Sequence, residues 1–199
     1  MSCINALEVS ASRLSSNEQK KTSKDNHEKP FSLLRSHEHH AASANFSPDG
    51  TIFVSGVLDG TIRFWDMSTK KMIKQIRAYQ GVAEGLDFSP DGSILASCSA
   101  DHTIRLWDAS SYSLIRTMGN DSFIVCDVSF SPNREILVSG SGDAIRFEDI
   151  RSFSEIAALD NLFFADIKSI IFSPGGEMVA AAHSSGEVWL IDPYTATIT

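Results

Sequence analysis

The sequence predicts an all-β fold built from four repeated units, and two observations support this prediction. The tripeptide Phe-Ser-Pro recurs at a fixed step of 42 residues, starting at Phe46, Phe88, Phe130 and Phe172. Each tripeptide is soon followed by a short and nearly all-apolar segment, as expected of a buried strand. A regular period of about 40 residues is typical of a repeat architecture, in which each unit is one supersecondary structure.

Each unit opens with a short strand and a tight turn. In the second unit the strand is 85–88 and the turn is Ser89-Pro90-Asp91-Gly92. Proline presets the backbone at the second turn position, aspartate suits the third and glycine the fourth, which is the chemistry of a type I turn. We therefore expect a hairpin at every Phe-Ser-Pro tripeptide.

The rest of each unit supplies three more strands. The second strand is nearly all apolar, which indicates burial on both of its faces. The third strand alternates and, in the first two units, ends in Trp65-Asp66 and Trp107-Asp108; a more polar fourth strand, such as 72–76, closes the unit. In three units the turn between the second and third strands carries an aspartate: Asp59, Asp101 and Asp143.

Four short strands in series make one blade, and a single blade cannot bury both faces of its sheet. Blades therefore stack around a common axis, which predicts a β-propeller with four blades of four antiparallel strands. The expected blades cover residues 40–77, 82–118, 124–159 and 166–199.

The N-terminal segment differs in composition from the repeats. Residues 1–30 are rich in Ser, Lys, Asn and Glu without sustained periodicity, so we expect a flexible polar tail. No segment has the apolar length of ~18 residues that a membrane span needs, and we see no secretory signal, so no membrane association is expected. Three widely spaced cysteines argue for a reducing compartment, the cytoplasm or the nucleus.

The charge of the chain argues against direct DNA binding. The formal net charge is −8, and the acidic excess lies in residues 31–199, which hold 12 Lys and Arg against 21 Asp and Glu. Contacts with phosphate supply most of the affinity for nucleic acid, and an acidic surface disfavours them.

The repeats closely resemble the WD40 family of β-propellers. The pairs Trp65-Asp66 and Trp107-Asp108 match the name-giving dipeptide, and Ser36-His37 stands where the family usually has Gly-His. The resemblance covers residues 31–199 and implies a WD40 β-propeller fold.

The resemblance also implies a structural tetrad of His, Ser, Asp and Trp in each repeat. The first repeat matches at all four positions, the second has Tyr79 in place of the histidine, and the third has Asp121 and Glu148 in place of the histidine and the tryptophan. The fourth repeat has lost the set, with Phe163, Ala181, Ser185 and Ile191 at these positions. The tetrad residues present are His37, Ser55, Asp59, Trp65, Ser97, Asp101, Trp107, Ser139 and Asp143.

The number of repeats predicts an incomplete ring. Propellers have about four to eight blades, and those of this family usually have about seven. Residues 31–35 resemble an extra outer strand, yet the last blade already has its own at 195–199. The favoured expectation is a partial propeller. Two alternatives stay open: pairing of two chains into an eight-blade ring, or displacement of 195–199 by 31–35. Open blade faces would favour self-association.

No motif points to catalysis, a metal or a cofactor. The run His37-Glu38-His39-His40 lacks the spacing of the zinc helix motif, and Gly140-Ser141-Gly142 lacks the lysine and helix of a phosphate loop. Cys98 and Cys126 fall in apolar strands and are read as core residues. We therefore predict that the chain is not an enzyme.

Two groups of residues are candidates for partner binding. Arg151 follows Asp149 by two residues, the spacing at which an arginine of some WD40 proteins helps to dock onto the adaptor of a cullin-type ubiquitin ligase, although Glu148 replaces the tryptophan. Phe123, Phe163, Phe164 and Tyr79 lie in the connections between blades, on the face that the family commonly uses for binding. Phe163 and Phe164 are equally well explained as apolar plugs between blades.

These observations predict a scaffold that binds other proteins or peptides in a multiprotein complex. One alternative is a component of a ribonucleoprotein complex in pre-rRNA processing. It rests on a third repeat that is one residue short near Asp143 and on residues 77–81, both similar to a ribosome-biogenesis WD40 protein of the small-subunit processome. The other alternative is a substrate receptor of a cullin-type ubiquitin ligase.

Overall fold

The computed structural model describes residues 40–119, 123–142, 144–160 and 166–199. These residues fold as one unit, and all their regular structure is β-strand. The expectations for the tail, for the strand at 31–35 and for the side chains of His37, Asp121, Asp143, Phe163 and Phe164 lie outside the described residues.

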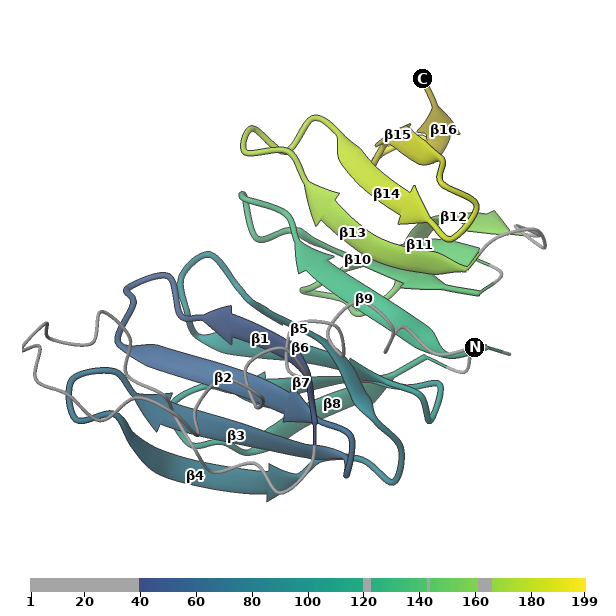
Figure 1. The fold of residues 1–199 in the computed structure, drawn as a ribbon. Coiled ribbons are helices and arrows are strands. Elements are labelled where there is room, and N and C mark those ends of the chain that lie inside the picture. Colours follow the sequence, from purple (N-terminus) through teal and green to yellow (C-terminus); the bar gives the residue numbers. More distant parts are fainter. Residues whose placement is uncertain (1–39, 120–122, 143, 161–165) are drawn as a thin grey trace, which may run out of the picture. The chain divides into compact units, whose positions relative to one another are not determined.

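The described residues form four antiparallel sheets of four strands, and each sheet follows the order of the sequence (Figure 1). This confirms the predicted all-β fold of four repeated blades, and the described sheets form no closed ring. The strands are β1 (Ala41–Phe46), β2 (Ile52–Val57), β3 (Thr61–Asp66) and β4 (Lys71–Arg77); β5 (Ala83–Phe88), β6 (Ile94–Ser99), β7 (Ile104–Asp108) and β8 (Leu114–Met118); β9 (Val125–Phe130), β10 (Ile136–Ser141), β11 (Ala144–Asp149) and β12 (Glu155–Asp160); and β13 (Ile167–Phe172), β14 (Val179–His183), β15 (Val188–Asp192) and β16 (Thr197–Ile198).

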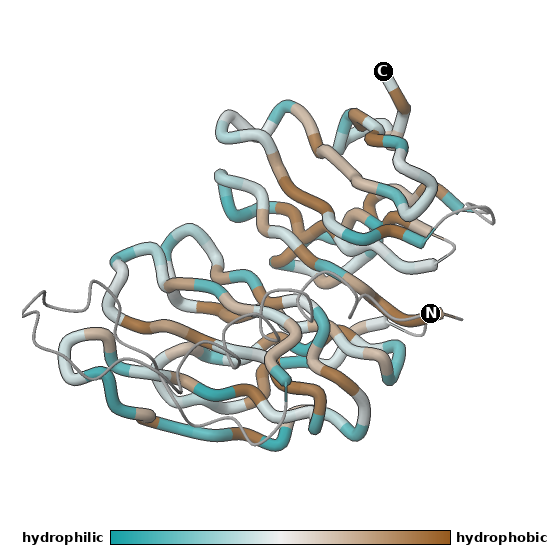
Figure 2. Tube along the Cα trace, in the orientation of Figure 1, coloured by the Kyte–Doolittle hydropathy of each residue, from teal (hydrophilic) through white to brown (hydrophobic). Residues whose placement is uncertain are grey.

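Consecutive sheets pack face to face, and a hydrophobic core lies at each of the three junctions. The first core joins Val54, Ile62 and Phe64 of the first sheet to Leu86, Phe88 and Leu95 of the second. The second and third cores repeat this plan between the second and third sheets and between the third and fourth. Figure 2 shows apolar residues gathered in the strands and polar residues at the turns.

The recurring serine has a local structural reason. In the first three sheets its hydroxyl oxygen accepts the backbone N–H of the first residue of the apolar strand, and in the fourth sheet that of the residue just before the strand, which closes the hairpin. The four distances are 2.9 Å for Ser47 and Ile52, 3.0 Å for Ser89 and Ile94, 2.8 Å for Ser131 and Ile136, and 3.1 Å for Ser173 and Met178. The turn thus depends on contacts within six residues, so it could be read from the sequence.

The one-residue shortening of the third unit lies in the turn between β10 and β11. Gly140 pairs with Ile145, whereas the equivalent pairs in the first two sheets are Gly56 with Ile62 and Cys98 with Ile104. One residue fewer therefore separates the paired positions in the third sheet, while the ladder between β10 and β11 continues without interruption.

Candidate functional site

The antiparallel strands give the unit two ends, at which different turns gather. We call one the Ser-Pro end; it carries the Ser-Pro turns and the turns between the third and fourth strands of each sheet. We call the other the connection end; it carries the turns between the second and third strands and the connections between sheets. The Ser-Pro end includes residues 47–51, 67–70, 89–93, 109–113, 131–135 and 150–154, and the connection end includes 58–60, 78–82 and 100–103.

Buried tryptophan and serine side chains meet in the first two sheets. Trp65 Nε1 donates to Ser55 Oγ at 3.2 Å, and Trp107 Nε1 donates to Ser97 Oγ at 2.8 Å. Each bond links the third strand to the second, so it holds the indole against its own sheet. These four residues were expected in the structural tetrads, and the structure brings them together in pairs.

Tyr79 completes the contacts of the second sheet. Its hydroxyl lies 2.6 Å from Ser97 Oγ and donates to the Ser97 carbonyl oxygen at 2.8 Å. The Arg105 guanidinium stacks over the ring, 4.5 Å from its centroid. Burial raises the pKa of the Tyr79 phenol above its ordinary value, so the hydroxyl stays protonated and remains a donor. Tyr79 is therefore an internal tie, with its ring buried away from the surface.

The aspartates of the tight turns bind locally. Asp59 Oδ1 accepts the Thr61 hydroxyl at 2.6 Å, and Asp101 Oδ1 accepts the Thr103 hydroxyl at 2.6 Å. Each carboxylate also accepts the backbone N–H of the same threonine, at 3.0 and 3.2 Å. These bonds shape the turn itself, as expected where Asp precedes Thr by two residues.

The last two sheets differ from the first two at these positions. In the third sheet Ser139 is buried on β10, and Glu148 lies opposite Leu137 in the ladder between β10 and β11. In the fourth sheet Ala181 and Ile191 belong to the core between the third and fourth sheets. Hydrophobic packing therefore occupies these positions in the fourth sheet.

The candidate binding residues do not gather at one place. Arg151 is exposed at the Ser-Pro end, where its Nη2 lies 3.3 Å from Glu135 Oε1 and its N–H donates to Asp149 Oδ1. Phe123 is exposed just before β9, at the connection end, beside exposed Ile124. Arg151 and Phe123 therefore lie at opposite strand ends and cannot contact one small ligand together.

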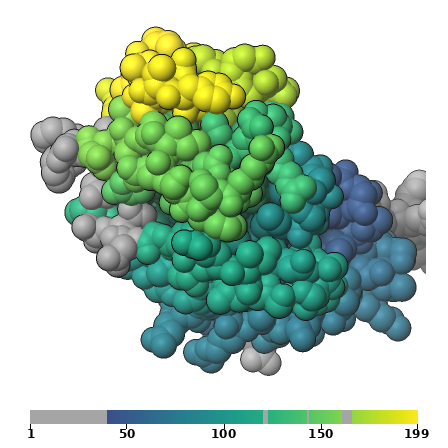
Figure 3. Space-filling model, turned by 180° about the vertical axis from the view of Figure 1, so that it is seen from behind, coloured from purple at the N-terminus to yellow at the C-terminus, as the bar shows by residue number. Residues whose placement is uncertain are grey.

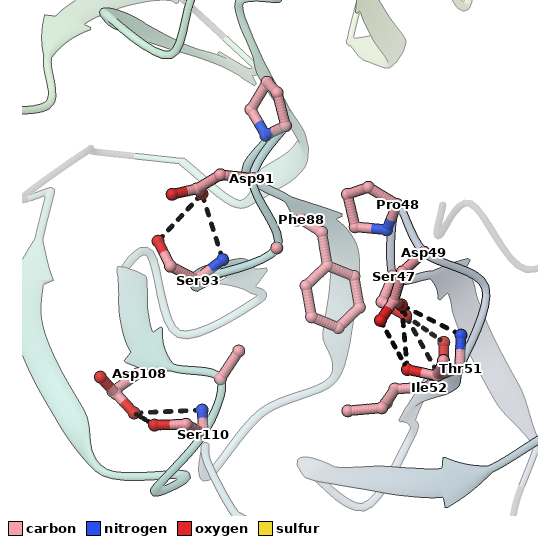
Figure 4. Close-up of a pocket in the computed structure, with 13 residues that line it drawn as sticks. Ser47, Pro48, Asp49, Thr51, Ile52, Phe88, Asp91, Ser93, Asp108 and Ser110 are labelled. Atoms are coloured by element: carbon pink, nitrogen blue, oxygen red, sulfur yellow. Dashed lines mark hydrogen bonds between the residues drawn. The ribbon is translucent and has the colours of Figure 1, made fainter.

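A groove that the sequence did not reveal lies between the first two sheets at the Ser-Pro end (Figure 4). It has a volume of about 560 Å³. The Phe88 ring points into the space between the turns 47–52 and 90–93, and Pro48 and Ile52 add to the apolar lining. The groove forms because the packing of the first two sheets brings their equivalent Ser-Pro turns side by side.

Three carboxylates surround this apolar lining: Asp49, Asp91 and Asp108. Hydrogen bonds from Ser47 and Thr51 hold the pKa of Asp49 below its usual value. Those from Ser110 and Ser111 lower the pKa of Asp108 to about 2. All three groups are therefore negatively charged at neutral pH.

Asp91 has a cation beside it. Desolvation opposes the downward shift of its pKa, but hydrogen bonds from Ser89 and Ser93 and the charge of Arg134 outweigh it. Arg134 from the third sheet forms an ion pair with the Asp91 carboxylate and donates to Ser93 Oγ at 2.8 Å. The pKa values of Asp49 and Asp108 are instead lowered by hydroxyl and backbone N–H donors.

The described residues contain no group of three or more His, Cys, Asp or Glu side chains placed to hold a metal ion. None of the elements described is a helix with the length and apolarity needed to cross a bilayer.

The fold and its repeated turns define a repeat protein built of propeller blades. The sequence profile of the WD40 family (WD domain, G-beta repeat) matches residues 28–66, 71–108 and 112–146, more than half of the chain. This chain belongs to the WD40 family. The third match ends just before Glu148, the position at which the tryptophan of the first two repeats is replaced.

A comparison with curated proteins found no match. The comparisons give no support to the resemblance with the ribosome-biogenesis protein of the small-subunit processome. WD40 domains typically act as protein-interaction scaffolds and are usually not catalytic.

Proposed function

We propose that this chain is a WD40 scaffold whose groove binds a segment of another protein that carries a Lys or Arg beside an apolar side chain. The observation that carries the proposal is the groove at the Ser-Pro end, where ionised Asp49 and Asp108 flank an apolar lining that includes Phe88. Other proteins or peptides are thus the proposed partners, without a cofactor.

The size and chemistry of the groove support such an occupant. Its volume of about 560 Å³ falls in the range of ~300–1,000 Å³ found for binding clefts. Burial of an apolar side chain against this lining supplies the favourable hydrophobic part of the affinity. The carboxylates add orientation and a faster encounter with cationic partners, which the net charge of −8 also favours.

A peptide library displayed against the full chain tests the proposal. Enriched peptides should carry Lys or Arg next to an apolar residue, and Ser110→Lys should weaken their binding by about tenfold or more, which corresponds to 1.4 kcal/mol. Ser68→Lys is the matched control, because Ser68 occupies the same turn position in the first sheet and does not line the groove. Enrichment of acidic peptides, or equal effects of the two variants, would contradict the proposal.

Two narrower roles expected from the sequence remain proposals. The exposed side chain of Arg151 at the Ser-Pro end favours a substrate receptor of a cullin-type ubiquitin ligase, since a docking residue must be accessible. The shortened turn between β10 and β11 is the feature that favours a ribonucleoprotein component in pre-rRNA processing, where contact with RNA would be indirect. Affinity purification with mass spectrometry separates them, because it recovers either the cullin adaptor or processome proteins.

The compartment and the state of association are also proposals. Cys98 and Cys126 are both free thiols, which fits the cytoplasm or the nucleus. Self-association through open blade faces is compatible with scaffold function, because the groove lies at a different place, between the first two sheets.

A further inference from the structure

The fourth sheet exposes an apolar face. The register of β13, β14 and β15 places Ile171, Ala180 and Leu190 side by side, with Val188 two residues before Leu190 on the same face. The exposed fractions are 61% for Ile171, 64% for Val188 and 47% for Leu190. The opposite face is buried against the third sheet, with Ile170, Phe172 and Ile191 in their shared core. We call the exposed side the trailing face.

The same face is covered in each of the first three sheets. Positions equivalent to Leu190 are Phe64, Leu106 and Phe147, each 0% exposed; positions equivalent to Val188 are Ile62, Ile104 and Ile145, at most 1% exposed. What covers these positions is the next sheet, as the three hydrophobic cores show. The trailing face therefore carries the same apolar residues that the next sheet covers elsewhere in the chain. In Figure 3 the C-terminal strands are yellow and lie beside the green third sheet.

The first sheet carries the complementary side. At each junction the covering residues include the phenylalanine before Ser-Pro, and Phe88, Phe130 and Phe172 are 5, 5 and 7% exposed. Phe46 is the equivalent residue in the first sheet and is 52% exposed. Its ring lies 5.0 Å from that of Phe53 on the paired strand, and exposed Ala44 lies on the same face. Farther along this side Ser55, Val57 and Trp65 are at most 3% exposed, so only its Ser-Pro end is open. We call this exposed part, made of Ala44, Phe46 and Phe53, the leading face.

We propose that two copies of this chain associate head to tail, with the trailing face of one copy (Ile171, Val188, Leu190) packed against the leading face of the other (Ala44, Phe46, Phe53). One chain exposes apolar residues from both sides of a junction that it already makes three times within itself, and this is the reason to choose a second copy as the occupant. The contact is heterologous, since different surfaces of the two copies meet.

The intermolecular junction should be weaker than the internal ones. Inside the chain a polar side chain of one inner strand bonds the backbone of the next: Asn45 Nδ2 donates to Leu86 O at 3.1 Å, and Asp87 Oδ2 accepts the Phe130 N–H at 2.7 Å. Ile171 occupies the equivalent position in the fourth sheet and cannot form this bond. Association should therefore be reversible and depend on protein concentration.

Light scattering coupled to gel filtration, on the full chain over a wide range of concentration, tests the proposal. We expect the mass to rise with concentration, and Leu190→Glu and Phe46→Glu each to shift the midpoint to at least about tenfold higher concentration. Ile115→Glu is the matched control, since Ile115 is 45% exposed on the outer strand β8, away from both faces. All substituted residues are exposed, and thermal unfolding followed by circular dichroism verifies that each variant folds.

Mixing the two variants tests the head-to-tail geometry. Leu190→Glu leaves an intact leading face and Phe46→Glu an intact trailing face, so the mixture should form one-to-one dimers at concentrations where each variant alone stays monomeric. A wild-type chain that stays monomeric at every concentration would overturn the proposal. So would a dimer that Leu190→Glu abolishes and Phe46→Glu leaves intact, because two trailing faces would then pair with each other.

Discussion

The Tyr79 hydroxyl lies 2.6 Å from Ser97 Oγ, so a phenol supplies the contact for which the WD40 family normally uses histidine. The connection between the first two sheets is thereby tied to β6, whose Ser97 also accepts the Trp107 indole N–H. A single serine thus joins a connection and two strands of the second sheet. Loss of one of these hydrogen bonds should lower the free energy of unfolding of the whole unit.

Tyr79→Phe removes this hydroxyl and keeps the ring. Because Ser97 is buried, we expect the free energy of unfolding to fall by about 1–3 kcal/mol, the usual effect of leaving a buried polar group with fewer hydrogen bonds. Urea denaturation measures the change. Tyr194→Phe is the control, since Tyr194 is exposed and should be neutral. Equal stability of the two variants would show that the tie to Ser97 contributes nothing.

The pH dependence of stability should report on Asp87. This carboxylate bridges three sheets, because Oδ1 accepts from Asn45 Nδ2 at 2.9 Å and Oδ2 accepts the Phe130 N–H. Desolvation raises the pKa of Asp87 to about 6, helped by the charge of Asp127 and opposed by these hydrogen bonds. The folded state therefore binds this proton more tightly than the unfolded state does.

The sign of the effect follows from linkage. Since the folded pKa of about 6 exceeds the ordinary value of 3.8, the contribution of Asp87 to stability falls as the pH rises from about 4 to 6. The loss is on the order of 2 kcal/mol. Asp87→Asn should flatten stability curves in this window. A wild-type curve that rises steadily from pH 4 to 6 would contradict the assignment.

Carboxylates of the surface turns affect stability in a lower pH range. Hydrogen bonds from Ser68 and Thr69 lower the pKa of Asp66 to about 2, so its contribution is present above pH 4 and lost as the pH falls toward 2. Removal of Ser68 Oγ, in Ser68→Ala, should raise the pKa of Asp66 toward its ordinary value. Titration followed by carboxyl-carbon NMR measures this shift, and an unchanged pKa would exclude Ser68 as the main cause.

Gly140 marks a close approach between the third and fourth sheets. A Cβ built on Gly140 would lie 2.5 Å from Ile167 Cγ2, so alanine cannot be accommodated without movement. We expect Gly140→Ala to cost about 1–3 kcal/mol, as overpacking does in well-packed cores. Ile167→Ala should cost about 2–5 kcal/mol alone, because it leaves a cavity.

A double-mutant cycle separates the steric effect from other causes. If the clash with Ile167 is responsible, the combined Gly140→Ala and Ile167→Ala variant should be more stable than the sum of the single changes indicates. If the two changes in the free energy of unfolding were strictly additive, the cost of Gly140→Ala would have a cause other than the clash with Ile167. Denaturant unfolding of the four proteins supplies all the required free energies.

The parts of the fold that could be predicted depend on contacts near in sequence. The hydroxyl of Ser89 closes its turn by accepting the N–H of Ile94, so the repeat of Phe-Ser-Pro was enough to place the sheets. Family spacing likewise placed Tyr79 at the histidine position, although its bonds to Ser97 needed the packed structure. Alternation of strand direction explains why Arg151 and Phe123 lie at opposite ends.

The groove could not be found in this way. Its rim joins Asp49 of the first unit to Asp91 and Asp108 of the second, and the separation between units depends on how Phe88 packs across the first core. No local pattern encodes that distance. Each aspartate alone looks like an ordinary turn residue, and only the junction of two sheets makes the three into one acidic rim.

Hydrogen exchange should distinguish the fourth sheet from the second. β7 is covered on both sides by neighbouring sheets, and its Trp107 is tied to Ser97. β15 has one exposed face, with Val188 and Leu190 open to solvent, and it pairs with the two-residue strand β16. Exchange through local opening should therefore be at least about tenfold faster in β15 than in β7 at low protein concentration.

Raising the concentration adds a second test to the same measurement. If the trailing face packs against another copy, protection in β15 should increase with concentration while that of β7 stays constant, because association stabilises only the ordered, bound form. Leu190→Glu should remove this dependence. Equal protection of β15 and β7 at low concentration would mean that the exposed face and the missing polar tie cost the fourth sheet no local stability.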